Sequence, residues 1–124
     1  MKTKILVVDD NREVCRTVAD MLGAMGAQIY EAFDGTEALG VFDKNQIDLA
    51  IVDLLFAGPV SSEIVVQHAQ LRKCPVITMS GTLASDPRGR DLGTPHLLKP
   101  FCTQQLVSLV EKTLAQRGRP SIVL

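Results

Sequence analysis

The sequence predicts an α/β fold, a doubly wound five-stranded parallel sheet with helices on both faces. Short apolar runs alternate with helical patterns along the chain, which is typical of successive βα units. Three of these runs are continuously apolar rather than alternating, as expected for parallel strands that are covered on both sides. The length of 124 residues leaves room for one domain with one core.

The five apolar runs are the expected strands. They cover residues 5–8, 27–30, 49–52, 76–79 and 97–98. For a chain of this size with helices between its strands, the compact strand order is 2-1-3-4-5. That order gives three layers, α/β/α, as in flavodoxin-like folds.

The helices between the strands have recognisable first residues. Asn11 can cap a helix that runs to about Met25, and Asp34 with Glu37 has the pattern of a capping box. Ser61 or Ser62 can open a third helix, and Thr103 a last one that Gly118 can end. The apolar positions expected on these last two helices are Ile64, Val65, Ala69 and Leu71, and then Leu106, Val110 and Leu114. The stretch 81–95 holds three glycines and two prolines, so a fourth helix there should be short, within 83–91.

Composition argues against several classes of protein. A net charge of −1 gives no broad attraction to nucleic acid or anionic membrane. The apolar runs are too short to cross a bilayer, and the first one leads into Asp9 and Asp10, unlike a signal peptide. Three widely spaced cysteines without a C-x-x-C pair favour reduced thiols over a disulfide framework or zinc site (Cys15, Cys74 and Cys102). We therefore expect a small cytoplasmic domain.

Polar residues follow four of the expected strands. Asp9 and Asp10 follow the first strand, and Asp53 follows the third. Ser80 ends the fourth strand and Lys99 the fifth. Because the carboxyl ends of parallel strands meet at one edge of the sheet, where such folds bind ligands, we expect these side chains to converge.

The converging groups indicate phosphoryl transfer. Three close carboxylates repel one another unless a cation is bound, and Mg²⁺ suits a site of few carboxylates with several retained waters. With such an ion and the ammonium of Lys99 to balance phosphoryl oxygens, a carboxylate can act as the nucleophile. Taken singly, each residue has a structural explanation: acids are favoured before a helix, and Asp and Ser are common in turns. Their joint placement at strand ends favours the functional explanation.

The motifs together resemble the receiver domain of two-component response regulators, the CheY-like domains. They are Val-Val-Asp9-Asp10-Asn, Ala-Ile-Val-Asp53-Leu, Val-Ile-Thr-Met-Ser80-Gly81 and Leu-Leu-Lys99-Pro100-Phe101. Each motif is modest alone, but their order and spacing are highly specific. The resemblance covers nearly the whole chain. It implies a single receiver domain over residues 1–124, with a core at about 3–116 and a C-terminal tail at 117–124.

The resemblance implies a role for each of these residues. Asp53 is the expected phosphoacceptor, which receives a phosphoryl group from the phosphohistidine of a sensor kinase. The expected Mg²⁺ ligands are Asp10, Asp53 and the backbone carbonyl of Leu55, with Asp9 contributing through water. Lys99 is expected to pair with the phosphoryl oxygens.

The resemblance also implies a switch and its partners. Ser80 is the expected switch hydroxyl, and His96 stands where the family usually has a switch Tyr or Phe. They would act on the face built from the short helix expected within 83–91, the strand at 97–98 and the last helix, which begins at Thr103 (helix 4, strand 5 and helix 5). A sensor histidine kinase or phosphotransfer protein would act upstream and an effector protein or domain downstream, with a homodimer left open.

The loop after Asp53 departs from the family pattern. Phe56 and Ala57 stand where Met and Pro are usual, Pro59 is displaced, and Ser61 replaces a glycine. These departures favour one alternative, an interaction module of the same fold that works without phosphorylation.

Two further alternatives belong to other functional classes. A phosphohydrolase with an aspartyl nucleophile needs a second acid two residues later, where this chain has Leu55, so we do not expect an enzyme. A flavin carrier needs a hydroxyl- and glycine-rich loop after the first strand, where this chain has Asp-Asp-Asn.

Overall fold

The computed structural model describes residues 2–81, 93–116 and 118. Along the chain these residues form β1 (Lys4–Val8), α1 (Arg12–Gly23), β2 (Gln28–Ala32), α2 (Gly35–Lys44), β3 (Leu49–Asp53), α3 (Ser62–Leu71), β4 (Val76–Ser80), β5 (His96–Leu98) and α5 (Thr103–Gln116). The short helix predicted within 83–91 lies outside the described residues, as does the predicted tail except for Gly118.

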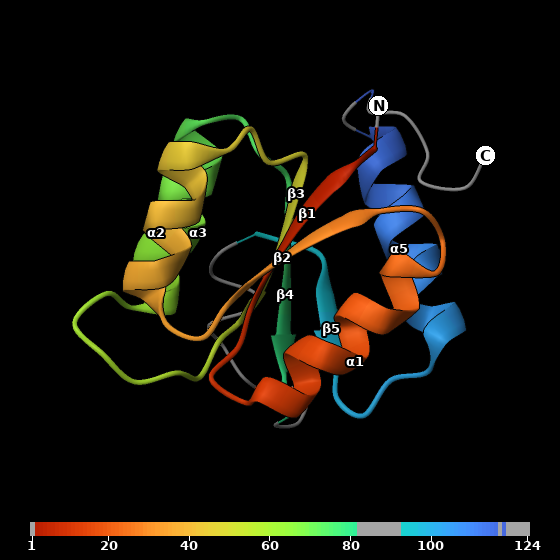
Figure 1. The fold of residues 1–124 in the computed structure, drawn as a ribbon, viewed down its shortest axis with the longest axis horizontal. Helices are drawn as coiled ribbons and strands as arrows, with labels where there is room; N and C mark the ends of the chain where they lie inside the picture. The colour runs from red at the N-terminus through yellow and green to blue at the C-terminus, as the bar shows by residue number, and fades with distance from the viewer. Residues whose placement is uncertain (1, 82–92, 117, 119–124) are drawn as a thin grey trace.

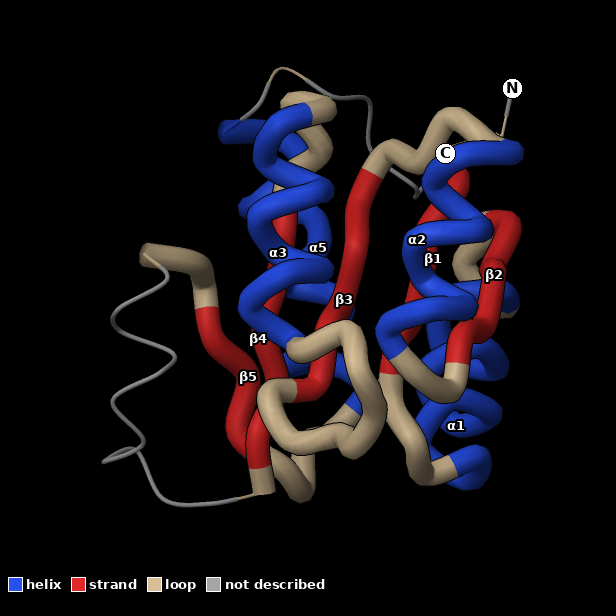
Figure 2. Tube along the Cα trace, turned by 90° about the vertical axis from the view of Figure 1, so that its left-hand side faces the viewer, coloured by secondary structure: helices blue, strands red, loops and turns tan. Residues whose placement is uncertain are grey.

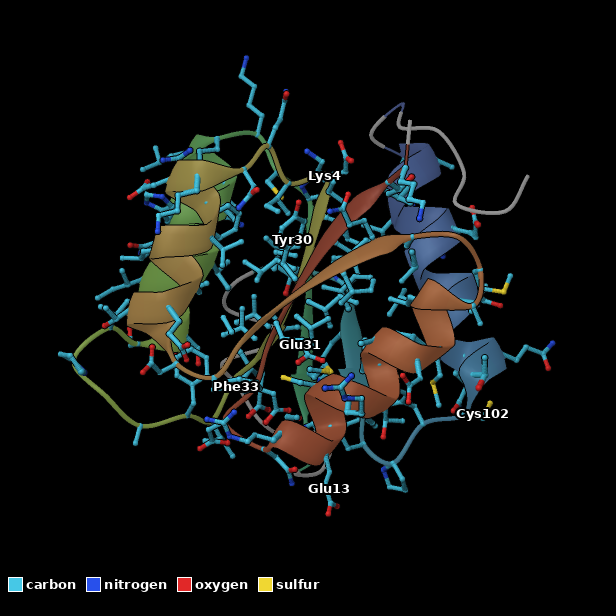
Figure 3. All side chains as sticks on the ribbon, in the orientation of Figure 1. Lys4, Glu13, Tyr30, Glu31, Phe33 and Cys102 are labelled. Carbon is cyan, nitrogen blue, oxygen red and sulfur yellow. The ribbon has the colours of Figure 1, made fainter. Side chains whose placement is uncertain are left out.

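The strands form one parallel sheet in the order β2-β1-β3-β4-β5, which confirms the predicted fold class. Helices α2 and α3 cover one face of the sheet and α1 and α5 the other (Figure 1). In Figure 3, Lys4 at the start of β1 and Phe33 just after β2 lie at opposite ends of the sheet. All five strands therefore end at the edge where Phe33 lies.

Each face of the sheet has its own hydrophobic core. Ile5 and Val7 of β1 pack in the layer beneath α1 and α5, while Leu6 and Val8 pack in the layer beneath α2 and α3. Because successive side chains of a strand point to opposite faces, a strand covered on both faces must be apolar at every position. The described helices include none with both the length and the apolar character that crossing a bilayer requires.

Helix caps fix where three of the helices begin. Asn11 caps α1 and Asp34 caps α2, as predicted, each accepting from backbone N–H groups of the first turn. Ser61 caps α3, which settles the choice between Ser61 and Ser62. The carboxylate of Glu37 accepts from the amide of Phe33 rather than from that of Asp34, so the capping box is shifted by one residue.

The four apolar residues expected on the third helix all lie on α3, but Ile64 and Leu71 are 45% and 85% exposed. That helix buries positions 62, 65, 66 and 69, a spacing of three and four residues that turns 64 and 71 toward solvent. Helix α1 ends at Gly23 rather than near Met25, because the chain turns at Gly26, whose φ is 103°. The stripe predicted on α5 is buried as expected.

Helices α2 and α3 are joined at their carboxyl ends by Arg72. Its guanidinium donates to the carbonyl of Phe42 at 3.0 Å and to the carboxylate of Asp43 at 2.7 Å. The Nε–H of Arg72 also donates to Nε2 of His68 at 3.0 Å. Arg72 ends α3, so these bonds tie the end of that helix to the last turn of α2.

At the other end, α2 begins against the loop of residues 54–61 that connects β3 to α3 (Figure 2). A Cβ atom at Gly35 would meet the carbonyl oxygen of Val60 and would lie 2.8 Å from the Cβ of Val60. Only glycine allows the start of α2 and the loop to approach so closely. The loop that follows Asp53 is therefore held against α2.

We expect Gly35→Ala to destabilise the protein by roughly 1–3 kcal/mol, because the loop or the start of α2 must move to admit the new methyl group. Gly40→Ala in the same helix is the matched control. No atom lies within 4 Å of a Cβ at Gly40, so this change should stabilise by about 0.5–1 kcal/mol. Urea denaturation of both variants measures the difference, and equal effects of the two substitutions would contradict the close approach.

Candidate functional site

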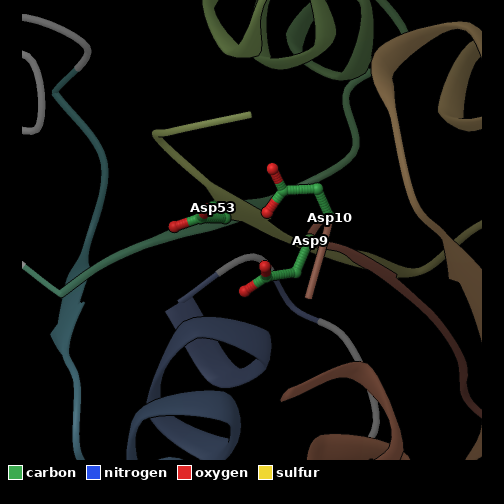
Figure 4. Close-up of side chains that lie close together, drawn as sticks. All are labelled: Asp9, Asp10 and Asp53. Carbon is green, nitrogen blue, oxygen red and sulfur yellow. The ribbon is translucent and has the colours of Figure 1, made fainter. Parts of the chain in front are cut away.

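Three carboxylates gather at the edge where β1 and β3 end (Figure 4). Each of Asp9, Asp10 and Asp53 offers one carboxylate oxygen, and the three oxygens lie within 4.8 Å of one another. Asp9 and Asp53 are 1% and 4% exposed, while Asp10 is exposed. The register explains the meeting: Val8 pairs with Val52, so Asp9, which follows β1, lies beside Asp53, the last residue of β3.

Lys99 binds two of these carboxylates. Its Nζ lies 2.7 Å from Oδ2 of Asp9 and 3.3 Å from Oδ1 of Asp53. The other oxygen of Asp9 accepts from the backbone amide of Asn11 at 2.9 Å. The backbone amide of Lys99 donates to the carbonyl of Ser80, which continues the hydrogen bonding of β5 to β4 and fixes where the lysine leaves the sheet.

The electrostatics of the site favour extra positive charge. Burial, followed by the charge of Asp9, raises the pKa of Asp53 to about 6 from its ordinary 3.8, although Lys99 opposes the change. Burial lowers the pKa of Lys99, but its hydrogen bond to Asp9 and the charge of Asp53 outweigh burial and raise that pKa overall. When all four groups are ionised, three carboxylates face one ammonium and two negative charges stay uncompensated.

The donor set fits a hard divalent cation. All three candidate ligands are carboxylate oxygens, which Mg²⁺ prefers over nitrogen or sulfur. The exposed Asp10 leaves a side open to water, and Mg²⁺ keeps several waters when it binds to few carboxylates. Leu55, whose carbonyl was predicted as a further ligand, lies two residues after Asp53, in the loop of residues 54–61, with its side chain 45% exposed.

The two residues predicted as the switch are in contact. The hydroxyl of Ser80, which is fully buried, lies 2.9 Å from Nε2 of His96. Nδ1 of the same ring lies 2.7 Å from the hydroxyl of Thr78. The register pairs Thr78 with His96, so the imidazole lies along β4 and bridges two of its hydroxyl groups.

Sequence reasoning missed two contacts within the site. The hydroxyl of Ser62 donates to the backbone carbonyl of Asp53 at 2.8 Å. The thiol of Cys15 donates to the carbonyl of Asp9 at 3.3 Å, and burial, with the charge of Asp9, raises the pKa of that thiol to about 12. Cys15 therefore stays protonated and is no nucleophile at neutral pH. Both contacts depend on how the first turn of a helix packs against the end of the preceding strand. The spacing of residues in the sequence does not reveal this packing.

Comparison with known proteins identifies the family of this chain from its sequence. Residues 5–111 match the response regulator receiver domain. The chain is 31% identical over 123 residues to the transcriptional regulatory protein ResD of Bacillus subtilis, covering 97% of this chain and 51% of that protein. It is 30% identical over 122 residues to the regulatory protein VanRc of Enterococcus gallinarum, covering 96% and 53%. This chain thus spans about half the length of these relatives.

Solved structures share the fold. The chemotaxis protein CheY4 of Vibrio cholerae superposes with a TM-score of 0.81 at 23% identity, covering 92% of this chain and all of that one. A CheY-like receiver domain protein of Methanospirillum hungatei superposes with a TM-score of 0.85 at 18% identity, covering 95% and 98%. With the sheet order, the cluster of acids at the strand ends and the match over residues 5–111, the chain belongs to the response regulator receiver domain family.

Proposed function

We propose that this chain is the phosphoacceptor receiver of a two-component phosphorelay, phosphorylated on Asp53 by a sensor histidine kinase in a Mg²⁺-dependent reaction. One observation carries the proposal: the buried carboxylate of Asp53 lies 3.3 Å from the ammonium of Lys99, within a cluster of three acids. The family match over residues 5–111 supports a receiver core at 3–116. The C-terminal tail at 117–124 stays a prediction.

In the proposed reaction, a carboxylate oxygen of Asp53 attacks the phosphorus of a phosphohistidine. The P–N bond breaks, the imidazole leaves, and an acyl phosphate forms on Asp53. Mg²⁺, when bound, supplies positive charge to the phosphoryl oxygens. Lys99 already contacts Asp53 and would move from the carboxylate to a phosphoryl oxygen.

Asp10, Asp53 and the carbonyl of Leu55 are the residues that would hold the ion. Asp9 would contribute through a water molecule, because one of its oxygens accepts from the amide of Asn11 and the other from Lys99. Those bonds fix the orientation of the Asp9 carboxylate before any cation arrives.

The switch that we propose begins at Ser80. In the proposed switch, the hydroxyl of Ser80 moves toward a phosphoryl group on Asp53 and away from Nε2 of His96, which it contacts at 2.9 Å. The ring of His96 then loses this contact with β4 and keeps the one to Thr78, and the edge of the sheet at β5 changes. Of the proposed output face, β5 and α5 are described, while helix 4 falls outside the described residues.

The proposed partners follow from the open surroundings of the site and from the relatives. A cleft of about 490 Å³ is lined in part by Asn11, Val14, Lys99 and Phe101, and it shares Lys99 with the site, so we propose that a phosphodonor protein contacts this side. Because the relatives are about twice as long as this chain, the effector is either a further domain or a separate protein. A homodimer stays open.

The alternative, an interaction module that works without phosphorylation, is favoured by the unusual loop after Asp53 and by the shortness of the helix predicted within 83–91. Against it stand the contacts of Lys99 with two acids and the raised pKa of Asp53, which a plain scaffold would not need. We propose a signalling domain rather than an enzyme, since Leu55 offers no acid group where a phosphohydrolase needs one.

We expect the chain to gain one phosphoryl group when it is incubated with Mg²⁺ and acetyl phosphate, and Asp53→Asn to gain none. The amide of asparagine is no nucleophile toward phosphorus, although it keeps the shape of the side chain. Asp20→Asn, at an exposed position of α1, is the matched control and should react like the unchanged chain. Intact-mass spectrometry measures the adduct, and an adduct that persists in Asp53→Asn would rule Asp53 out.

Mg²⁺ should bind about tenfold more weakly at pH 5 than at pH 8. The pKa of Asp53 is raised to about 6, so one pH unit below it roughly nine tenths of these carboxyls hold a proton and cannot hold the cation. Titration of Mg²⁺ followed by NMR at the two pH values gives the Kd. Asp53→Asn, which lacks the titrating group, should show a much smaller ratio, and equal Kd values for the unchanged chain at both pH values would contradict the raised pKa.

Ser80→Ala should uncouple phosphorylation from β5. In the unchanged chain, activation should shift the ring resonances of His96 and the amide of Leu98, because the hydroxyl of Ser80 leaves the imidazole. In Ser80→Ala the same resonances should stay nearly constant, while Asp53 still reacts. NMR spectra with and without acetyl phosphate make the comparison. If the resonances of Ser80→Ala moved on activation as much as those of the unchanged chain, the proposed relay would be wrong.

A further inference from the structure

The hydroxyl of Ser62 makes a contact that its place at the start of α3 does not require. Ser61 caps the helix, so the amides of its first turn do not need Ser62. Ser62 is only 2% exposed, and its Oγ donates to the backbone carbonyl of Asp53 at 2.8 Å. The contact closes the whole loop of residues 54–61 back onto the end of β3.

The contact holds one particular peptide unit. The carbonyl of Asp53 and the N–H of Leu54 belong to the same planar unit and point in opposite directions. The N–H of Leu54 donates to the carbonyl of Met79 on β4 at 2.9 Å. The carbonyl of Asp53 therefore points toward the β1 side, where the pairing of the two strands has already ended at Val8. The hydroxyl of Ser62 donates to this carbonyl in place of the backbone N–H that a longer β1 would have offered.

With a hydrogen bond on each side, this peptide unit cannot rotate without losing one of them. The orientation of the unit in turn fixes the direction in which the side chain of Asp53 leaves the backbone. Lys99 lies 3.3 Å from that carboxylate, and the oxygens of the acid cluster lie within 4.8 Å of one another, so a small rotation would disturb the site. Without the hydroxyl, the carbonyl of Asp53 would also be a buried acceptor in need of a new partner.

We propose that Ser62 is a positioning residue for the phosphoacceptor: its hydroxyl holds the peptide unit after Asp53 and so aims the Asp53 carboxylate at Lys99 and the cation site. This inference rests on the proposed function of Asp53. A merely structural hydroxyl would stabilise the fold without affecting the site, and the neighbouring serine makes that difference measurable. Ser61→Ala removes the cap of α3, whereas Ser62→Ala removes the bond to Asp53.

Titration of Mg²⁺ at pH 8 compares the variants. Ser62→Ala should raise the Kd for Mg²⁺ roughly three- to tenfold, which is the range expected for the loss of one hydrogen bond that orients a ligand. Ser62→Thr keeps the hydroxyl and should bring the Kd back to within about twofold of the unchanged chain. Ser61→Ala should lower stability toward urea but leave the Kd unchanged. A Kd that is the same in Ser62→Ala and Ser61→Ala would overturn the proposal.

A second readout needs no metal. In EDTA at pH 8, the side-chain carboxyl ¹³C resonance of Asp53 should shift or broaden in Ser62→Ala but not in Ser61→Ala. The amide of Leu54 should also exchange with solvent several-fold faster in Ser62→Ala. If the unchanged chain takes up no Mg²⁺, the proposed function of Asp53 fails, and the metal-free resonance still decides the role of Ser62. An Asp53 resonance that is identical in all variants would exclude that role.

Discussion

The structure depends on negative charge that is buried where β1 and β3 end. Asp9 and Asp53 are almost wholly excluded from water, and Lys99 lies between them at 2.7 and 3.3 Å. Burying a carboxylate is unfavourable unless an opposite charge or hydrogen bonds replace its water. The ammonium of Lys99 replaces the lost water of Asp9, but it does so only partly for Asp53, whose pKa rises to about 6. The site therefore gains stability from any further positive charge that enters it.

The strand order makes this arrangement possible. β1 and β3 are neighbours in the sheet, although α1, β2 and α2 lie between them in the chain. Asp9, which follows β1, and Asp53, which ends β3, therefore lie close together. One position earlier, Val8 and Val52 are in the hydrophobic layer beneath α2 and α3. The last core residue and the first site residue are thus consecutive in both segments, which leaves little freedom to shift the register.

The sequence was sufficient for the features that repeat or that are local. Continuous apolar runs predicted the parallel strands, and short-range chemistry at Asn11 and Asp34 predicted where two helices begin. The convergence of Asp9, Asp53 and Lys99 followed from topology, since parallel strands end at a common edge. These features need only a run of apolar residues, a capping residue at the start of a helix, or a rule about connectivity.

The features that were missed depend on how distant segments pack. The outward turn of Ile64 on α3 follows from which neighbours the helix meets, and Val65 meets the core in its place. The bond from Ser62 to Asp53 and the bridge from His96 to Thr78 require the exact return path of a loop or a strand pairing. A hydroxyl in a sequence has many possible partners, and only the folded chain selects one.

Helices α2 and α3 are attached to their surroundings at both ends. Arg72 fastens these helices to each other at one end, and the close fit of Gly35 against Val60 fastens them to the loop beside Asp53 at the other. On the opposite side of Asp53, β4 and β5 are joined by their backbone pairing and by the imidazole of His96, which contacts the hydroxyls of Thr78 and Ser80. In the proposed switch, a change at Asp53 would therefore act on the side-chain contacts between β4 and β5, whereas α2 and α3 are fastened at both ends.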